Sequence, residues 1–326
     1  MRIPVFLLII LSSFLGLISC NAPHENPLDP ENPDNRLYSI EGNVYSSEAA
    51  VKPIAGIKVN WSVDNVTAVT DKNGYFKIQS KQLKDGWLYF TGSGFSSDSL
   101  LVAWNGQKNY SVRESLNEIP TLDSIYIYSS ITNKYSGPEY QLTFKIYISD
   151  TDDDIDTVSI LCLGLSINKT IQKMNSGYFS SDYSDVDLGL SSFDEVIGKN
   201  FDVYAKTREG NRFYVGTSNV KRIIHDEIVI LSPINSDTLS TNNPNLKWTR
   251  YISGFNFYYR LEIYTDEPEP KLLWSKDNVS SDSIAIYVST SIIPTPDNNK
   301  FFWDIWCVDE YRDQARSKPA GFVILN

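Results

Sequence analysis

The sequence predicts an all-β protein in which three tandem β-sandwich domains follow one another along the chain. Two observations carry this prediction. The first is composition, since aromatic residues make up 13% of the 326 residues, with 20 Tyr and 7 Trp, whereas Met and His occur twice each. The second is pattern, since short stretches of alternating apolar and polar residues recur along the chain between turn residues, which is typical of half-buried strands. A hydrophobic content of 41% is enough for packed cores.

Residues 1–20 have the pattern of an export signal, and this pattern ends at a cysteine. An apolar stretch follows Arg2 and is shorter than the roughly 20 apolar residues of a membrane-spanning helix. It ends in the tetrapeptide Leu-Ile-Ser-Cys at 17–20, which resembles the lipobox of bacterial lipoproteins. The resemblance implies that residues 1–19 form a lipoprotein signal peptide and that Cys20 becomes an acylated N-terminus carrying palmitate. Acyl chains hold a protein at a membrane, because each CH₂ group buried in the bilayer contributes about 0.8 kcal/mol to the free energy of membrane binding.

The segment after the cysteine is rich in proline. Residues 21–35 contain four prolines and almost no apolar residue, so this stretch cannot form a core and favours an extended, semi-stiff chain. We therefore assign residues 20–36 to a lipidated tether. The expected location is the cell envelope, lipid-anchored to a bacterial membrane. The outer membrane is favoured, and both a periplasmic and a surface-facing orientation remain open.

Residues 37–118 carry the pattern of a first sandwich. Alternating stretches flank a tight turn at 71–74, where we expect a hairpin because an Asn-Gly pair adopts positive φ at little cost. The order of these features resembles the carboxypeptidase regulatory-like domain, a transthyretin-like β-sandwich common in envelope proteins. The resemblance implies a structural or accessory module without catalytic residues of its own. It is carried by Gly42, Val44, Pro53, Gly56, Val59, Thr70, Asp71, Asn73, Gly74, Tyr75, Phe76, Gly94 and Phe95.

Two further sandwiches are predicted, at residues 122–224 and 226–326. In the first range, alternating strands with regularly spaced turns indicate an immunoglobulin-like domain. The second range resembles a fibronectin type III domain, and the residues that carry the resemblance are Trp248, Trp303, Ile305 and Cys307. The last three alternate along one strand, so we expect them to share the core face. The residues expected on the opposite face are Phe302, Asp304 and Trp306.

An acidic run in the middle domain is a candidate metal site. The four residues concerned are Asp150, Asp152, Asp154 and Asp156. Carboxylates are ligands that Ca²⁺ prefers, but the run lacks the glycine and the terminal glutamate of an EF-hand loop. We favour a polar turn between strands and keep Ca²⁺ binding as the alternative. A second acidic loop, at 180–187, would add ligands if it folded nearby.

Tryptophans that face outward from strands would suit stacking on sugar rings. The three candidates are Trp306, Trp87 and Trp104. For Trp306 the favoured interpretation is packing against a neighbouring domain. Two or three exposed aromatic side chains lying coplanar on one face would favour a carbohydrate-binding surface, whereas isolated ones would favour a spacer.

Composition and motifs argue against several functions. A net charge of −11 and a pI of about 4.7 disfavour nucleic-acid binding. The sequence contains no G-x-S-x-G and no H-E-x-x-H motif, and His225 is the only histidine beyond the tether, so we expect no enzyme. Cys162 and Cys307 fit no metal-binding spacing and lie in different predicted domains, so we expect buried free thiols.

These observations favour a non-enzymatic lipoprotein of the cell envelope, a structural or interaction module that presents its β-sandwich domains to a protein partner. The alternatives are a carbohydrate-binding surface lipoprotein and a Ca²⁺-dependent adhesin. No cofactor other than Ca²⁺ is expected. The expected partners are the membrane, through Cys20, and an envelope protein or glycan whose identity the sequence leaves open.

Overall fold

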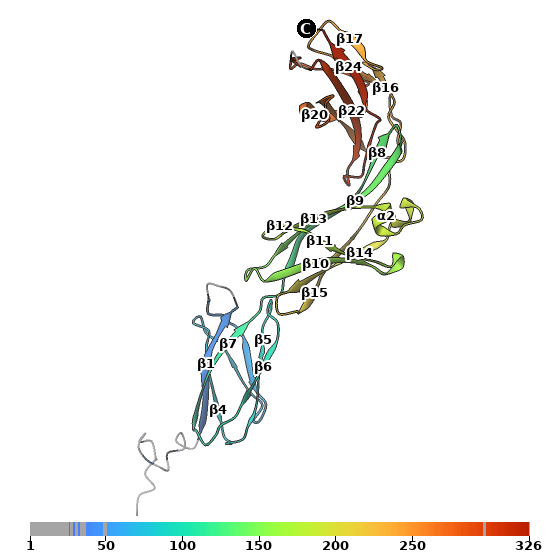
Figure 1. Cartoon of the computed structure of the whole chain (residues 1–326). Coiled ribbons are helices and arrows are strands. Elements are labelled where there is room, and N and C mark those ends of the chain that lie inside the picture. Colours follow the sequence, from blue (N-terminus) through green and yellow to red (C-terminus); the bar gives the residue numbers. More distant parts are fainter. Residues whose placement is uncertain are drawn as a thin grey trace, which may run out of the picture. The chain divides into compact units, whose positions relative to one another are not determined.

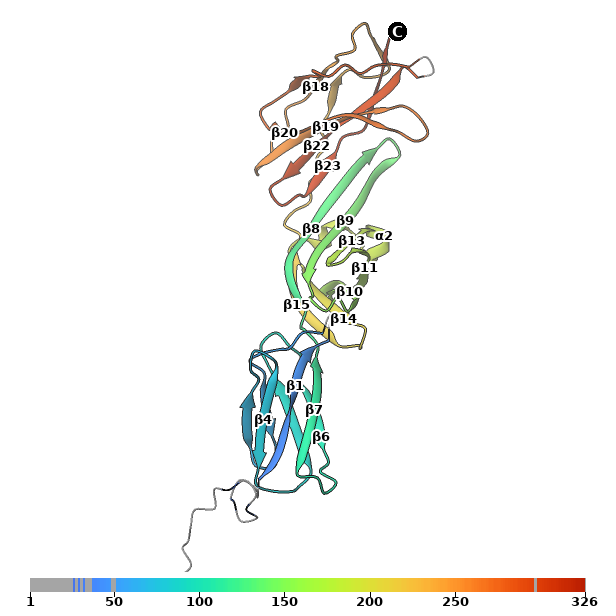
Figure 2. The same cartoon turned by 90° about the vertical axis from the view of Figure 1, so that its left-hand side faces the viewer.

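The computed structural model describes most of the chain beyond the tether. The described residues are 37–47, 51–295 and 298–325, together with Asn26, Asp29 and Asn32. The predictions for the signal peptide, for Cys20 and for the rest of the tether lie outside the described residues. The chain divides into two compact units, Met1–Ile119 and Pro120–Asn326 (Figures 1 and 2).

Within the described residues, nearly all regular structure is β-strand. The exceptions are α2 (Asp185–Leu188) and the 3₁₀ segments η2 (Leu163–Leu165) and η3 (Phe193–Val196). The prediction of an all-β chain of tandem β-sandwich domains is confirmed. None of the helices in the described part of the chain is long and apolar enough to cross a membrane.

The first unit is a sandwich of two sheets, with strand orders β4-β1-β7 and β3-β2-β5-β6. Its strands are β1 (Tyr38–Ser46), β2 (Lys58–Trp61), β3 (Val66–Val69), β4 (Tyr75–Ser80), β5 (Gly86–Thr91), β6 (Asp98–Val102) and β7 (Asn109–Leu116). Side chains along β4 alternate strictly between exposed and buried, as a strand with one face on the core requires. The inward side chains of both sheets form a single core.

Two tryptophans lie in this core. The rings of Trp61 and Trp104 meet edge to face, with centroids 6.2 Å apart. Trp61 Nε1 donates to Ser80 Oγ at 3.2 Å, and Trp104 Nε1 donates to the Lys84 carbonyl oxygen at 3.0 Å. Both buried N–H groups are therefore satisfied. Trp104 is only 2% exposed, so the prediction that it stacks on a sugar is wrong.

The tight turn at 71–74 is present, but it does not close a hairpin. Asp71 Oδ1 accepts hydrogen bonds from the backbone N–H groups of Asn73 and Tyr75, at 2.8 and 3.0 Å. Gly74 has a φ of 71°, and a Cβ there would lie 2.3 Å from the Val44 carbonyl oxygen. β3 pairs with β2 before the turn, and β4 pairs with β1 after it. The hairpin prediction is wrong because a local turn signal does not determine which strands pair.

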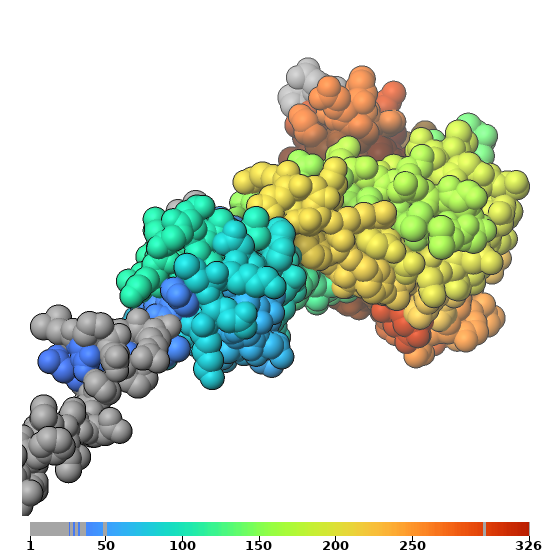
Figure 3. Space-filling view, turned by 90° about the horizontal axis from the view of Figure 1, so that it is seen from below, coloured from blue at the N-terminus to red at the C-terminus, as the bar shows by residue number. Residues whose placement is uncertain are grey.

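The second unit holds two more sandwiches, each with its own core. The middle sandwich is the surface coloured from green to yellow in Figure 3. Its strands are β8 (Thr121–Lys134), β9 (Gly137–Ser149), β10 (Ile155–Cys162), β11 (Ile167–Ile171), β12 (Lys173–Asn175), β13 (Tyr178–Ser184), β14 (Asn200–Thr207) and β15 (Arg212–Asn219). The strands of the last sandwich are β16 (Ile230–Ser232), β17 (Asp237–Leu239), β18 (Asn245–Trp248), β19 (Phe257–Thr265), β20 (Leu272–Ser280), β21 (Ala285–Tyr287), β22 (Lys300–Asp309), β23 (Gln314–Arg316) and β24 (Ala320–Ile324).

The inward alternation predicted for β22 is confirmed. Trp303, Ile305 and Cys307 are each 0% exposed and belong to the core of the last sandwich. Cys162 belongs to the core of the middle sandwich. Both cysteines are buried and free, as predicted.

One ten-stranded sheet runs through both sandwiches of the second unit. Its main order is β12-β13-β9-β8-β23-β22-β19-β20. The two halves join where β8 pairs in parallel with β23, with Ser130 opposite Gln314 and Thr132 opposite Arg316. β8 and β9 form a long hairpin that reaches from the middle sandwich to the last one (Figure 2). The two sandwiches are therefore joined by main-chain hydrogen bonds as well as by the linker between them.

A buried polar network lies at the same junction. Asp313 is 0% exposed, and its Oδ1 accepts from Ser129 N at 2.7 Å and from Ser129 Oγ at 3.0 Å. Asp309 Oδ1 accepts from Asp313 N at 2.9 Å, and Asp309 Oδ2 lies 2.9 Å from Arg222 Nε. Burial raises the pKa of Asp313 to about 6. The network ties β8, the segment after β15 and the loop after β22 to one another.

Candidate functional site

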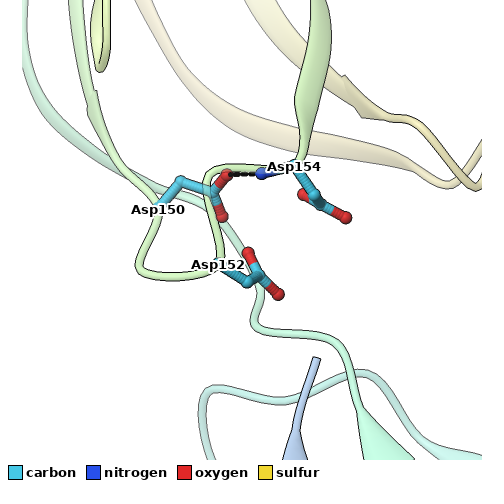
Figure 4. Close-up of side chains that lie close together, drawn as sticks. All are labelled: Asp150, Asp152 and Asp154. Carbon is cyan, nitrogen blue, oxygen red and sulfur yellow. Dashed lines mark hydrogen bonds between the residues drawn. The ribbon is translucent and has the colours of Figure 1, made fainter. Parts of the chain in front are cut away.

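The acidic loop after β9 brings three carboxylates together. Asp150 Oδ2 accepts a hydrogen bond from the backbone N–H group of Asp154 at 2.9 Å (Figure 4). It also accepts from the backbone N–H group of Ile155 at 3.2 Å, and the two bonds close the loop into a tight turn. Carboxylate oxygens of Asp150, Asp152 and Asp154 all lie within 4.8 Å of one another. The loop therefore forms a polar turn and also gathers three of the four predicted metal ligands.

Two carboxylates of this group, those of Asp150 and Asp154, resist ionisation. Burial, together with the neighbouring Asp152, raises the pKa of Asp150 to about 7. Burial and the same neighbour raise the pKa of Asp154 to about 6. The Oδ1 atoms of Asp150 and Asp154 are shielded from solvent and accept no hydrogen bond. A divalent cation at this point would offset most of the negative charge of the ionised group and could coordinate these oxygens.

The other acidic candidates lie elsewhere. Asp156 is exposed, and its Oδ2 accepts from Thr157 Oγ1 at 2.9 Å. In the second acidic loop, Asp182 accepts from Thr143 Oγ1 at 2.6 Å, and Asp187 caps α2. Within the described residues, the carboxylate group consists of Asp150, Asp152 and Asp154 alone.

The outer face of the β3-β2-β5-β6 sheet carries two exposed aromatic side chains. Trp87 and Tyr89 alternate along β5, so they leave the same face about 7 Å apart. They are 44% and 45% exposed. Across the sheet, Leu101 lies beside Trp87 and Asn60 beside Tyr89. The two side chains therefore share one exposed face of this sheet.

Trp306 also lies on an outer face, but its ring is covered. The guanidinium groups of Arg260 and Arg316 lie 4.5 and 5.7 Å from the ring centroid. Trp306 Nε1 donates to Glu262 Oε2 at 3.0 Å. Beside it on β22, Asp304 is 0% exposed and lies 3.3 Å from Arg316 NH1. The covering side chains come from the same sheet and not from a neighbouring domain, which corrects the favoured interpretation of this residue.

His225 has one close acidic partner. Its Nε2 lies 2.6 Å from Asp194 Oδ1, and the two side chains are 49% and 55% exposed. In the part of the chain that the structure describes, no serine or cysteine side chain hydrogen-bonds to this histidine. A catalytic triad would also require a nucleophile within hydrogen-bond reach of the histidine.

Comparison with known proteins gives structural matches only. No family model and no curated protein matches the chain. The fibronectin(III)-like modules of Clostridium thermocellum CbhA are 13% identical, with a TM-score of 0.29, covering 64% of this chain and 93% of that one. The FN1–FN3 domains of chicken CNTN1 are 8% identical, with a TM-score of 0.33, covering 89% and 96%.

A putative carbohydrate binding protein from Bacteroides uniformis is 10% identical, with a TM-score of 0.23, covering 56% of this chain and 98% of that one. Identities and TM-scores of this size leave the function to be argued from the chain's own residues.

Proposed function

We propose that this chain is a non-enzymatic, lipid-anchored protein of the bacterial cell envelope that presents its β-sandwich domains to a protein partner. The observation that carries the proposal is the tetrapeptide Leu-Ile-Ser-Cys at 17–20, which has the spacing of a lipobox. Acyl chains on Cys20 would hold the chain at the membrane, and the proline-rich residues 21–35 would separate the folded domains from it.

The joined sandwiches of the second unit support the presenting role. The β8–β23 pairing and the buried network around Asp313 resist bending between the two sandwiches. A partner bound to the last sandwich would therefore stay at a fixed position relative to the middle one. Loops and sheet edges supply the contact surfaces of such a protein.

Metabolic labelling with an alkyne analogue of palmitate tests the anchor. We expect label on the wild-type chain in the membrane fraction and none on Cys20→Ala. The matched control is Cys162→Ala, which removes a buried thiol and keeps Cys20, and it should remain labelled. Equal labelling of the wild type and Cys20→Ala, or no labelling of either, contradicts the anchor.

A second candidate function is Ca²⁺ binding at Asp150, Asp152 and Asp154. Its support is the gathering of three carboxylate groups within 4.8 Å, with raised pKa values at Asp150 and Asp154. Because both folded-state pKa values are raised, these groups favour the folded state below about pH 4 and lose that contribution as the pH rises to about 7. Calcium should offset the loss.

We expect about 5 mM Ca²⁺, which exceeds the dissociation constants of extracellular Ca²⁺ modules, to raise the melting temperature at pH 8 and to have little effect at pH 5. Asp152→Asn should abolish the shift, and Asp156→Asn should keep it. Identical melting curves in Ca²⁺ and in EDTA at pH 8 contradict the site.

A third candidate is carbohydrate binding through Trp87 and Tyr89. Its support is that these two side chains share one open sheet face. Native gels cast with soluble neutral polysaccharides test it, because binding slows migration. We expect the wild type to be slowed by at least one polysaccharide and the Trp87→Ala/Tyr89→Ala double variant to migrate freely. Equal migration of both proteins in every gel rules out this face.

A further inference from the structure

The middle sandwich has a hollow of about 660 Å³ between the loop after β9 and the turn that joins β12 to β13. The size falls within the range of about 300–1,000 Å³ that is typical of small-molecule sites. Residues that line it include Asp123, Tyr147, Asp153, Lys173, Asn175 and Tyr178. All of the lining residues belong to the middle sandwich, so the hollow is complete within one domain.

One wall of the hollow is aromatic. Tyr147 on β9 and Tyr178 on β13 are opposite each other across the two strands. Their rings stack with centroids 4.6 Å apart and an angle of 13° between the planes, and Tyr126 meets Tyr147 edge to face at 6.4 Å. Tyr147 remains 37% exposed. The stacking holds the rings in place before any ligand arrives, which lowers the entropy lost on binding.

The turn beside this wall depends on a glycine. Gly177 has a φ of 73°, and its carbonyl oxygen accepts from Ile148 N at 2.8 Å. A Cβ on Gly177 would lie 2.8 Å from the Ile148 carbonyl oxygen. The turn therefore lies directly against the end of β9, which keeps Tyr178 in register with Tyr147.

The rim of the hollow is polar and held by its own contacts. Asp123 Oδ2 accepts from Ser149 Oγ at 2.7 Å. On the other side, Asp153 Oδ1 accepts from Ser176 Oγ at 3.0 Å and lies 3.5 Å from Lys173 Nζ. Each of these carboxylates keeps a second oxygen that can accept a hydrogen bond from a ligand. The lining of the hollow thus offers both aromatic carbon and carboxylate oxygens that can accept hydrogen bonds from hydroxyl groups.

Charge and composition narrow the class of ligand. Even with the Asp150 carboxyl protonated, the lining carries two further aspartates, Asp123 and Asp153, against a single cation, Lys173, so phosphate, sulfate and uronate groups would be repelled. A purely apolar ligand would exclude water from the second oxygens of Asp123 and Asp153 without replacing the hydrogen bonds that water makes to them. A neutral sugar ring has C–H faces that pack on aromatic carbon and hydroxyls that donate to carboxylates.

From this geometry we infer that the hollow beside Tyr147 and Tyr178 binds a neutral carbohydrate. The ligand class is the same as in the third candidate function, carbohydrate binding through Trp87 and Tyr89. The binding residues are different, and they lie in the second unit. It does not depend on Trp87, on the carboxylate group being loaded with Ca²⁺, or on the anchor at Cys20.

Saturation-transfer NMR on the purified full chain in detergent tests the site. The probes are neutral hexasaccharides of glucose, xylose, mannose, galactose and N-acetylglucosamine, with hexagalacturonate as the acidic comparison. We expect transfer to at least one neutral probe and none to the acidic one. Tyr178→Ala should weaken binding at least tenfold. Asp123→Asn should weaken it severalfold, and this exposed carboxylate is replaced without disturbing the core.

The matched control is the Trp87→Ala/Tyr89→Ala double variant, which should bind as the wild type does. If that variant loses binding while Tyr178→Ala and Asp123→Asn keep it, the hollow is the wrong site and the carbohydrate-binding candidate stands on β5. If no neutral probe receives transfer, the inference fails. The palmitate labelling is a separate measurement and is unaffected by either result.

Discussion

Trp87 and Trp306 occupy equivalent positions in different sandwiches, yet their surroundings differ. Each lies on the outer face of a sheet, Trp87 on β5 and Trp306 on β22. Trp87 is 44% exposed. Trp306 is half-buried between the guanidinium groups of Arg260 and Arg316, and its indole N–H donates to Glu262. The first tryptophan is available to a ligand, whereas the second is part of a layer that covers its own sheet.

The difference arises from cross-strand neighbours. Register places Arg260 and Arg316 on either side of Trp306, whereas Leu101 lies opposite Trp87. The arginine layer also seals Asp304, which is 0% exposed beneath it. An outward tryptophan is therefore a candidate binding residue only where the neighbouring strands leave its ring faces open.

Arg316→Met should have the largest effect, because it leaves the buried Asp304 without its cation. We expect a loss of about 3–5 kcal/mol of unfolding free energy at pH 8, the usual result of breaking a buried ion pair from one side. The loss should be smaller at pH 5, where the Asp304 carboxyl takes up a proton. Urea unfolding followed by circular dichroism measures both values.

The matched control is Arg113→Met in the first unit. The Arg113 guanidinium also lies over an aromatic ring, 4.5 Å from the centroid of Tyr45, but it is exposed. We expect this change to cost less than about 1 kcal/mol. Equal losses for the two variants would show that Asp304 does not depend on Arg316.

The inward side of β22 was predictable from sequence, and its partners were not. Alternation alone places Trp303, Ile305 and Cys307 in the core, because side chains of a strand point to opposite faces in turn. β23, by contrast, is three residues long and pairs with β8 across more than 180 positions of the chain. A strand this short has no periodic pattern, so the shared sheet could not be foreseen.

The candidate sites divide in the same way. Asp150, Asp152 and Asp154 lie in one short loop, so their proximity follows from local structure and could be predicted. Trp104 follows β6 in a loop, and only packing against Trp61 decides that it is buried. Tyr147 and Tyr178 come from separate strands, and their stacking depends on a register that the sequence does not reveal.

Asp304→Asn should change how stability depends on pH. Burial raises the pKa of Asp304 to about 7, above the value of 3.8 for an unperturbed carboxyl. The protonated folded state is therefore favoured below about pH 4, and this contribution is lost as the pH rises to about 7. The wild type should lose on the order of 2–3 kcal/mol more than Asp304→Asn over that range.

Urea unfolding at half-unit pH intervals measures the slope of the unfolding free energy against pH. The contributions of the other carboxylates cancel in the difference between the two proteins, because both proteins contain them. The exposed Asp156→Asn serves as the control and should follow the wild-type slope. Parallel slopes for the wild type and Asp304→Asn would mean that the carboxyl is already ionised at pH 5 and that the layer does not shield it.

Trp306→Ala should cost about 2 kcal/mol, because it removes two arginine contacts, buried ring area and the hydrogen bond to Glu262. Trp306→Phe keeps an aromatic ring between the arginines and loses the indole N–H, so we expect roughly half that loss. Calorimetric melting of the wild type, Trp306→Phe and Trp306→Ala gives the order of their stabilities. If Trp306→Phe is as unstable as Trp306→Ala, the hydrogen bond, and not the stacking, carries the stabilisation.

Trp87→Ala should have the smallest effect, less than about 0.5 kcal/mol, since an open aromatic side chain contributes little to the folded state. A Trp→Ala substitution would then lower the unfolding free energy several times less on β5 than on β22. The measurement is the urea midpoint at an unchanged m-value. A loss near 2 kcal/mol would mean that the Trp87 ring packs as firmly as the Trp306 ring. The face on β5 could then no longer be treated as an open aromatic surface, and the case for carbohydrate binding would rest on Tyr147 and Tyr178 alone.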